Sequence, residues 1–217
     1  TLRIAMGAVL GELSLGQISQ ALSDLTACYV RGMLDVVVEL PGSSVHADKP
    51  LESLDFGIIA MGRFGGEELG FGSDADVMFV YEPLPGIIPE LAQKTAERII
   101  SDLKLLAADP LLEFELDLDL RPEGKNGPNA RSLDSYRAYY ERWADTWESQ
   151  ALLRAKPIAG SEALVSAFVE LINSYRYPKE LPTSAVMEIR RIKARMETER
   201  LPQGADSRRH TKLGKGS

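Results

Sequence analysis

Residues 56–82 read "FGIIAMGRFGGEELGFGSDADVMFVYE" and contain two short apolar runs, 56–62 and 75–82, around a glycine-rich turn. Each run has the length and the flanking residues of a buried strand. A turn that only reverses the chain needs one or two glycines. The additional glycines therefore predict a backbone that approaches another group closely. Two aspartates spaced one residue apart, Asp74 and Asp76, follow the turn directly.

Helices and a further strand are expected around this pair of runs. Apolar residues at helical spacing predict helices over 14–40 and 87–108, the second with Pro89 in its first turn. Residues 111–120, "LLEFELDLDL", alternate apolar with acidic side chains. This alternation predicts a half-buried strand with one acidic face. The order helix, strand, turn, strand, helix, strand predicts an α+β core built on a small mixed sheet.

Three parts of the chain are distinguished by these patterns. Residues 1–50 form an N-terminal helical segment and linker, 51–131 the α/β core, and 132–217 a subdomain whose pattern is helical throughout. The last residues carry no helix-ending signal. We therefore expect the helical subdomain to continue beyond Ser217.

Charge and composition exclude several classes of function. The formal net charge of the chain is −7. Residues 188–217 carry a net charge of +5, and residues 1–187 carry a net charge of −12. An acidic body argues against a nucleic-acid partner, because that affinity comes from many phosphate contacts. No apolar run reaches the length of a membrane span, so no membrane association is expected. The single cysteine, Cys28, favours a reducing, cytoplasmic location.

Asp74 and Asp76 have the spacing of a metal-binding pair. Residues i and i+2 of a strand point to the same face about 6.6 Å apart, and two carboxylates suit a hard cation such as Mg²⁺. A second metal would need another carboxylate, which Asp117 or Asp119 on the acidic strand face can supply. An isolated Asp-x-Asp is most often a polar strand edge. The preceding glycine turn and the later acidic strand favour a functional site.

The turn also has the residue types of a phosphate-binding loop. Glycines let backbone N–H groups approach phosphate oxygens, and a serine hydroxyl or a guanidinium adds further donors. The stretch is not a Walker loop, because it lacks the string G-x-x-x-x-G-K-[ST], and it is not a dinucleotide fingerprint, because a strand rather than a helix follows it. The predicted phosphate contacts are Arg63, Gly65, Gly66, Gly72, Ser73 and, after the acidic strand, Arg121.

Four motifs together resemble one enzyme family. They are "AMGRFGGEELGFGSDADVMFVYEP" (60–83), "ELDLDLRPEGKNGP" (115–128), "YYERWADTWESQALLRAKPIAGS" (139–161), and "IRRIKARMETERLPQGAD" (189–206) with "HTKLGKGS" (210–217). In order and spacing they are similar to glutamine synthetase adenylyltransferases, also called glutamate-ammonia-ligase adenylyltransferases, and most of all to the actinobacterial members. The first motif is shared in outline with all polymerase-β-like nucleotidyltransferases. The set of four is specific to this family.

The resemblance implies a fold, a reaction and partners. It implies a polymerase-β-like nucleotidyltransferase core at 51–131 and the C-terminal, adenylylating half of a two-part enzyme. That half moves AMP from ATP to a tyrosine of glutamine synthetase, with Mg²⁺ as cofactor, and lowers its activity in nitrogen regulation. A PII-type signal protein and glutamine would regulate it. We also include Lys156 and Lys212, which lie in the later motifs, among the nucleotide-binding residues.

Position by position, the resemblance assigns the metal site. Asp74 and Asp76 match the metal-binding pair of the family, and Asp117 matches the acid that stands five residues before the proline of its Arg-Leu-Arg-Pro string. This chain departs from that string at its first position, which is Asp119. Asp119 then either assists the metal or merely replaces a phosphate contact with a solvated acid.

Three alternatives remain open at this stage. The chain could be the deadenylylating half, which removes AMP with phosphate as nucleophile. It could also be a catalytically silent nucleotide-binding module, against which the intact Asp74, Asp76 and Asp117 argue. A nucleic-acid polymerase fits the acidic body least well.

Overall fold

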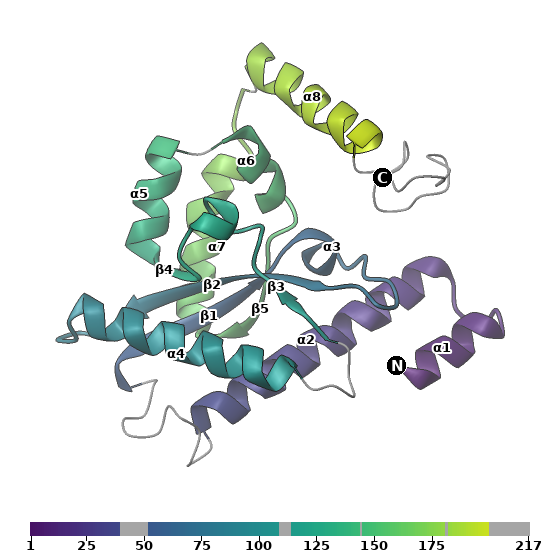
Figure 1. Cartoon of the computed structure of the whole chain (residues 1–217), viewed down its shortest axis with the longest axis horizontal. Helices are drawn as coiled ribbons and strands as arrows, with labels where there is room; N and C mark the ends of the chain where they lie inside the picture. The colour runs from purple at the N-terminus through teal and green to yellow at the C-terminus, as the bar shows by residue number, and fades with distance from the viewer. Residues whose placement is uncertain (40–51, 109–113, 144, 181, 200–217) are drawn as a thin grey trace.

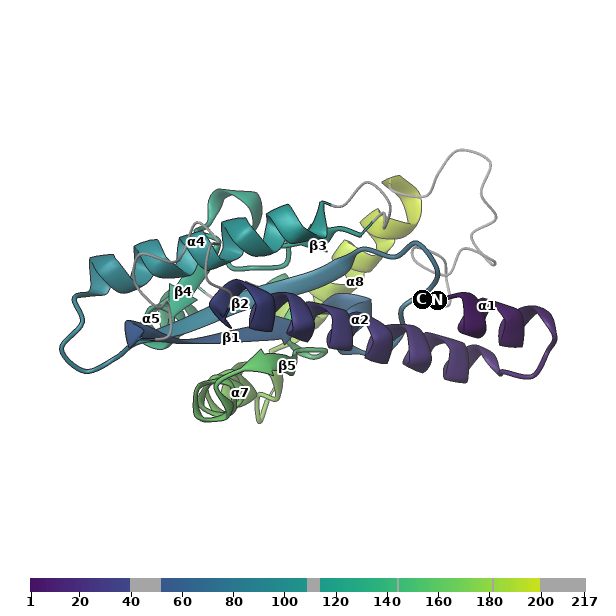
Figure 2. The same ribbon diagram turned by 90° about the horizontal axis from the view of Figure 1, so that it is seen from below.

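Five strands form one mixed sheet with helices on both faces (Figure 1). The computed structural model describes residues 1–39, 52–108, 114–143, 145–180 and 182–199. Helices α2 and α4 lie along one face of the sheet, and Figure 2 shows them side by side across β1 and β2. Helices α5, α6 and α7 lie on the other side. The fold is that of a polymerase-β-like nucleotidyltransferase core, as the sequence predicts.

The strands have the order β3-β2-β1-β5, and β4 also pairs with β2. β1 lies antiparallel to both β2 and β5, whereas β3 and β4 run parallel to β2. β2 and β3 are joined through helix α4, which is the crossover that a parallel pair requires. The strands are β1 (Leu54–Ala60), β2 (Ala75–Pro83), β3 (Leu116–Asp117), β4 (Ala130–Ser132) and β5 (Lys156–Gly160).

The two faces of the sheet bury different sets of apolar residues. Phe56 and Phe79, from β1 and β2, pack toward α2 and α4 in the larger cluster. Ile59 and Met78, from the same strands, pack toward α5 and α7 with Phe168. Both central strands are apolar on each face because both faces are covered by helices. The site residues lie at one end of these strands, outside the two clusters.

The helices occupy most of the positions that the sequence predicts. None of the described helices is long and apolar enough to cross a membrane. Their bounds are α1 (Leu2–Val9), α2 (Leu15–Glu39), α3 (Gly62–Gly65), α4 (Pro89–Ala107), α5 (Leu133–Trp143), α6 (Thr146–Leu152), α7 (Glu162–Arg176) and α8 (Thr183–Glu199), with a 3-10 turn at Gly124–Asn126.

Two sequence predictions need correction. The pattern after residue 132 is not helical throughout, because Lys156–Gly160 forms strand β5 and extends the core sheet beside β1. The strand predicted over 111–120 is confirmed only at Leu116–Asp117, and residues 109–113 lie outside the described part. The alternation itself holds there, since Leu116 and Leu118 are buried while Asp117 and Asp119 are half-buried.

Candidate active site

Three carboxylates converge at the end of the sheet where β2 begins. Asp74 directly precedes β2, Asp76 lies within it, and Asp117 ends β3. One oxygen from each of the three lies within 4.8 Å of the others, and all three side chains are half-buried. Among the described residues, this is the group with the composition and spacing of a metal site. The same three aspartates are predicted from the sequence and its family resemblance.

Strand geometry explains why these side chains meet. β2 and β3 are parallel, and Asp76 is the register partner of Asp117. Paired residues of neighbouring strands point to the same face, and Asp74 lies two residues before Asp76 along β2. The intervening Ala75 and its partner Leu116 are buried on the opposite face. The alternation within each strand and the parallel register between the two strands therefore place the three acids together on one face.

Gly62 is a site residue that the sequence analysis did not name. Its φ is +51°, a left-handed conformation that side-chain-bearing residues rarely adopt. A Cβ at this position would collide with the carboxylate of Asp76, and the amide of the preceding Met61 donates to the Asp76 carbonyl at 2.8 Å. Gly62 is the first glycine after β1, and this position is the sequence feature from which its role could have been predicted. It lets the backbone run directly beside a predicted metal ligand.

The glycine loop, residues 62–73, is packed more tightly than a simple phosphate cradle. A Cβ at Gly65 would overlap the carbonyl oxygens of Arg154 and Ala60, so this glycine allows two backbone segments to meet. Gly66 lies against the side chain of Arg154. Gly72 has φ +68° and open space around it. The group that Gly65 approaches is the protein's own backbone, and the predicted contact of the loop with phosphate stays a prediction.

Arg63 and Ser73 close the glycine loop beside the carboxylates. An Nη atom of Arg63 donates to Ser73 Oγ at 3.0 Å, and the Gly70 amide donates to the same oxygen at 3.1 Å. Ser73 immediately precedes Asp74. Two predicted phosphate contacts therefore lie together next to one of the acids.

Two further cations reach the loop from the segment around the start of β5. Lys156 forms an ion pair with Glu67, and Arg154 forms one with Glu68 at 2.6 Å. Lys156 was predicted among the nucleotide-binding residues, whereas Arg154 was not. Arg154 was missed because its contact with the loop joins residues far apart in the chain. The predicted Lys212 lies outside the described residues.

Arg121 has a different position from the one expected. Its side chain is 8% exposed and is directed into its own loop rather than toward a phosphate. Its guanidinium donates hydrogen bonds to three carbonyl oxygens, those of Leu118 (2.8 Å), Gly127 (3.2 Å) and Lys125 (3.3 Å). These contacts fix the loop that follows Asp117.

Asp119 lies outside the group of three acids. Its carboxylate pairs with Lys125 at 3.1 Å, and its amide donates to Asp117 Oδ1 at 2.7 Å. The backbone of Asp119 therefore orients a member of the acidic group, while its side chain neutralises a lysine of the next turn. The Asp119 side chain is 43% exposed, so of the two roles left open by the sequence the geometry favours the solvated acid over the metal ligand.

Glu148 on α6 is a buried carboxylate that the sequence analysis did not single out. It is 3% exposed and accepts hydrogen bonds from the Tyr139 hydroxyl (2.7 Å), the Asp145 amide (2.9 Å) and the Glu123 amide (3.3 Å). Burial, and then the charge and hydrogen bond of Glu148, raise the pKa of Tyr139, so its hydroxyl remains a donor. Glu148 thereby ties the loop after β3 to α5 and α6.

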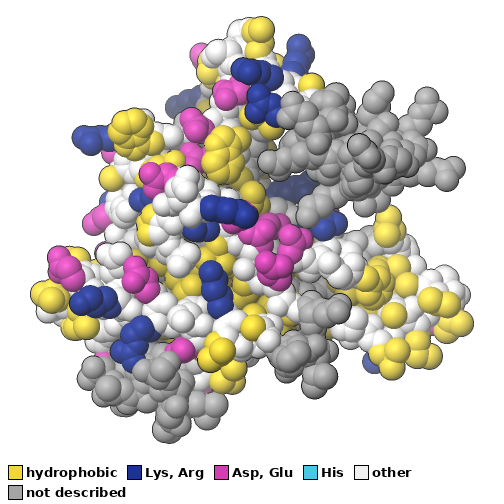
Figure 3. All heavy atoms as spheres, viewed as in Figure 1, with side chains coloured by type: hydrophobic (Ala, Val, Ile, Leu, Met, Phe, Trp, Pro, Cys, Tyr) yellow, Lys and Arg dark blue, Asp and Glu magenta, His cyan; other side chains and the backbone are white. Residues whose placement is uncertain are grey.

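The surface around the site is mixed in charge. Figure 3 shows acidic side chains gathered near the centre of this face, with Lys and Arg side chains around them. A cation held by the acids and a polyanion held by the surrounding basic groups would both find opposite charge there.

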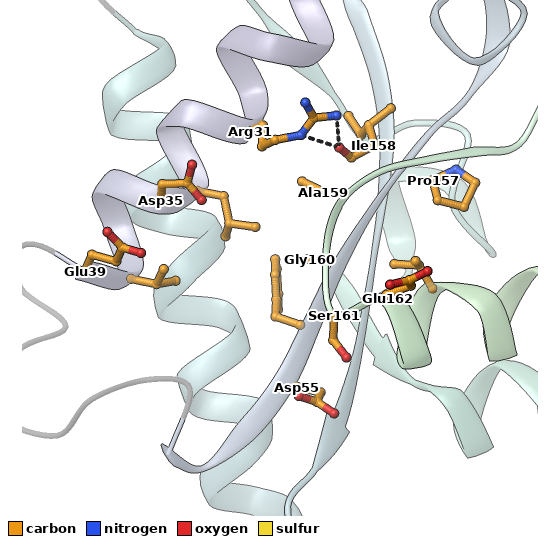
Figure 4. A pocket seen from close by; sticks show the side chains of 14 residues that line it. Arg31, Asp35, Glu39, Asp55, Pro157, Ile158, Ala159, Gly160, Ser161 and Glu162 are labelled. Atoms are coloured by element: carbon orange, nitrogen blue, oxygen red, sulfur yellow. Dashed lines mark hydrogen bonds between the residues drawn. The ribbon is translucent and has the colours of Figure 1, made fainter.

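A separate hollow of about 520 Å³ lies at the other edge of the sheet, between α2, β5 and α7 (Figure 4). Arg31 donates two hydrogen bonds across it to the Ile158 carbonyl, at 3.2 and 3.0 Å. Four acids also line this hollow, with Asp35 and Glu39 on α2 facing Glu162 on α7. The fourth is Asp55.

Comparisons with known proteins identify the family of the chain. A family model described as glutamate-ammonia ligase adenylyltransferase matches residues 1–171. Three similar curated proteins are each named bifunctional glutamine synthetase adenylyltransferase/adenylyl-removing enzyme. The protein from Leifsonia xyli is 50% identical over 216 residues, covering 100% of this chain and 21% of the relative. The protein from Streptomyces avermitilis is 52% identical over 201 residues, covering 90% of this chain and 19% of the relative. The protein from Mycobacterium tuberculosis is 45% identical over 217 residues, covering 99% of this chain and 21% of the relative.

The present chain spans about a fifth of the length of these relatives. The matched region includes both strands of the acidic group and the whole glycine loop. Its motifs, its fold and the family match over 171 of its residues agree. The chain therefore belongs to the glutamate-ammonia ligase adenylyltransferase family.

Proposed function

We propose that this chain transfers AMP from ATP to a tyrosine hydroxyl of glutamine synthetase, as the adenylylating half of its enzyme. The observation that carries the proposal is the convergence of Asp74, Asp76 and Asp117 beside a glycine loop. The names of the relatives supply the acceptor protein. We propose that the reaction takes place in the cytoplasm. We also propose that the nucleotidyltransferase core comprises residues 51–131 together with β5, which extends its sheet.

The three aspartates fit Mg²⁺. Their donor set is entirely carboxylate oxygen, which hard divalent cations prefer, and the oxygens are close enough to share one ion or two neighbouring ions. Asp74, Asp76 and Asp117 would be the ligands. When bound, the metal supplies positive charge that neutralises the phosphate oxygens of ATP.

The basic side chains around the glycine loop would bind the triphosphate. Arg63 belongs to this loop, Arg154 and Lys156 contact it from outside, and Ser73 adds a hydroxyl. Guanidinium and ammonium groups hold phosphates through charge-assisted hydrogen bonds. Their arrangement next to Asp74 would keep the α-phosphorus near the acids while the β- and γ-phosphates lie along the loop.

Asp117 is the residue we propose to take the proton. The unperturbed pKa of tyrosine is about 10, so its hydroxyl needs a proton acceptor at neutral pH. The tyrosine oxygen forms a bond to the α-phosphorus and its proton passes to the Asp117 carboxylate. The bond between the α-phosphorus and pyrophosphate breaks, and pyrophosphate leaves with that electron pair.

A transfer assay with the chain as it stands tests this proposal. ATP labelled in its adenosine part is incubated with unmodified glutamine synthetase and Mg²⁺. The expected result is label on glutamine synthetase and release of one pyrophosphate for each label. Binding of ATP without pyrophosphate release would favour a silent nucleotide-binding module.

Adenylyl removal is a second candidate, because the relatives carry both activities in their names. It is tested with adenylylated glutamine synthetase and inorganic phosphate, without ATP. Phosphate-dependent loss of AMP from the protein, with no labelling in the first assay, would assign the chain to the deadenylylating half. Regulation by a PII-type signal protein is tested by adding that protein to whichever assay is positive.

A further inference from the structure

Two consecutive acids in the glycine loop form ion pairs with basic side chains that surround it. Glu68 pairs with Arg154 at 2.6 Å, and Glu67 pairs with Lys156 and accepts a hydrogen bond from Gln20 at 3.3 Å. The loop thus holds two carboxylates against two cations at the place where the triphosphate is proposed to bind.

The backbone of Glu67 indicates that its side chain has a specific use. Its φ is +59°, a left-handed conformation that glycine adopts without strain and that costs a side-chain-bearing residue about 1 kcal/mol or more. Gly65 and Gly66 precede it directly. A third glycine would adopt this conformation without strain, so the presence of a glutamate points to a use for its side chain.

The two ion pairs are exposed and therefore weak. The side chains of Arg154 and Glu68 are 47% and 53% exposed, and those of Lys156 and Glu67 are 50% and 35% exposed. Exposed pairs of this kind are easily exchanged for another anion. A polyphosphate carries several adjacent negative groups and can replace both carboxylates, whereas a single phosphate can replace only one.

We propose that Glu67 and Glu68 compete with phosphate groups for Lys156 and Arg154 and so lower the affinity of the glycine loop for phosphate. A polyphosphate that binds both cations must displace both acids, whereas a single phosphate displaces only one, so the acids weaken polyphosphate binding more. The inference rests on the proposed function, since it takes the glycine loop as the phosphate-binding surface. It adds an anionic competitor that the chain itself supplies in the ligand-free protein.

Titration calorimetry with inorganic tripolyphosphate, and separately with inorganic phosphate, tests the inference without metal or nucleotide. Wild type is compared with Glu67→Gln, Glu68→Gln and the double variant. Each single substitution is expected to tighten tripolyphosphate binding about 2- to 5-fold, the range that corresponds to one exposed ion pair. The double variant should tighten tripolyphosphate binding by about the product of the two single effects but inorganic phosphate binding by only one of them, and so widen the preference for tripolyphosphate.

Glu90→Gln is the matched control, because it makes the same charge change on an exposed residue at the start of α4, beyond the opposite end of β2. Suppose that wild type binds tripolyphosphate and transfers AMP, but that Glu67→Gln and Glu68→Gln bind tripolyphosphate no more tightly than wild type. That result would leave the proposed function standing and overturn this inference. An equal gain in Glu90→Gln would overturn it too, since net charge would then explain the effect. Failure of every protein to bind tripolyphosphate would overturn both this inference and the phosphate-binding role of the loop.

Discussion

Two regions at opposite edges of the sheet are rich in carboxylates, yet they differ in arrangement. At the start of β2, three aspartates bring one oxygen each within 4.8 Å of the others. In the hollow beside β5, four acids surround a space of about 520 Å³, and the described acids there do not form such a group. The one arginine of the hollow is bound to a backbone carbonyl. Convergence, rather than the number of acids, distinguishes the candidate metal site.

Substitution of one acid in each region tests this difference most directly. Asp76→Asn removes a proposed metal ligand and should lower AMP transfer about 1,000-fold, the size expected when charge stabilisation of the transition state is lost. Asp55→Asn, in the hollow, should leave the rate at its wild-type value. The transfer assay with labelled ATP measures both. Equal rates in the two variants would remove the basis for the metal assignment.

Glu148 adds a third kind of carboxylate, buried and fully hydrogen-bonded. Glu148→Ala should lower the free energy of unfolding by about 3 kcal/mol, because three donors lose their acceptor. Urea unfolding followed by circular dichroism gives the value. Glu148→Gln keeps an acceptor oxygen and should lose less. A loss below about 0.5 kcal/mol in the alanine variant would mean that water replaces the carboxylate without cost.

The effect of Mg²⁺ on thermal stability should distinguish the two acidic regions. At tenfold excess over its Kd, a ligand of the folded state adds about 1.4 kcal/mol. For a chain of this size that corresponds to a Tm rise of about 3–6 °C in wild type. The rise should vanish in Asp74→Asn and persist in Glu39→Gln, which lies in the hollow. Differential scanning calorimetry at matched ionic strength provides the measurement, and a rise that persists in Asp74→Asn would contradict the site.

The smallest effect concerns Glu82, near the other end of β2 from the acidic group. Burial, and then the negative charge of Asp134, raise the pKa of its carboxyl above 4.5, against the opposing effects of the Leu133 amide and Arg137. A carboxyl whose pKa is higher in the folded state destabilises the protein at neutral pH, and this cost disappears below pH 4.5, where it is protonated in both states.

Glu82→Gln should therefore raise Tm by about 1 °C at pH 7 and leave it unchanged at pH 4. The glutamine keeps an acceptor for the Leu133 amide, so the comparison isolates the charge. Thermal unfolding at the two pH values measures the difference. A lower Tm at pH 7 would show that the ionised carboxylate stabilises the fold.

Local patterns in the sequence predict most of the site. Asp74 and Asp76 follow from their spacing on a strand, because residues i and i+2 share one face. The alternation over 111–120 leaves Asp117 and Asp119 both open as the third acid, and the family resemblance selects Asp117. Strand β5 was missed, since "KPIAG" contains proline and two small residues and has no apolar alternation. Its place beside β1 depends on pairing between distant segments.

The roles of the basic residues depend on contacts that no local pattern contains. The position of Arg121 in the sequence suggests a phosphate contact, but three carbonyls of its own loop take up its donors. Gly65 is required by the carbonyl of Arg154, which lies 89 residues later in the chain. Such nonlocal packing decides which cations face the glycine loop.

The parallel pairing of β2 with β3 also has a consequence for folding. Asp76 and Asp117 are 41 residues apart in sequence, and they meet only after α4 has packed against the sheet and closed the crossover. Contacts of long sequence separation form late because loop-closure entropy opposes them. The acidic group is therefore complete only in chains that have reached the native topology, and metal affinity becomes a reporter of correct folding rather than of the ligands alone.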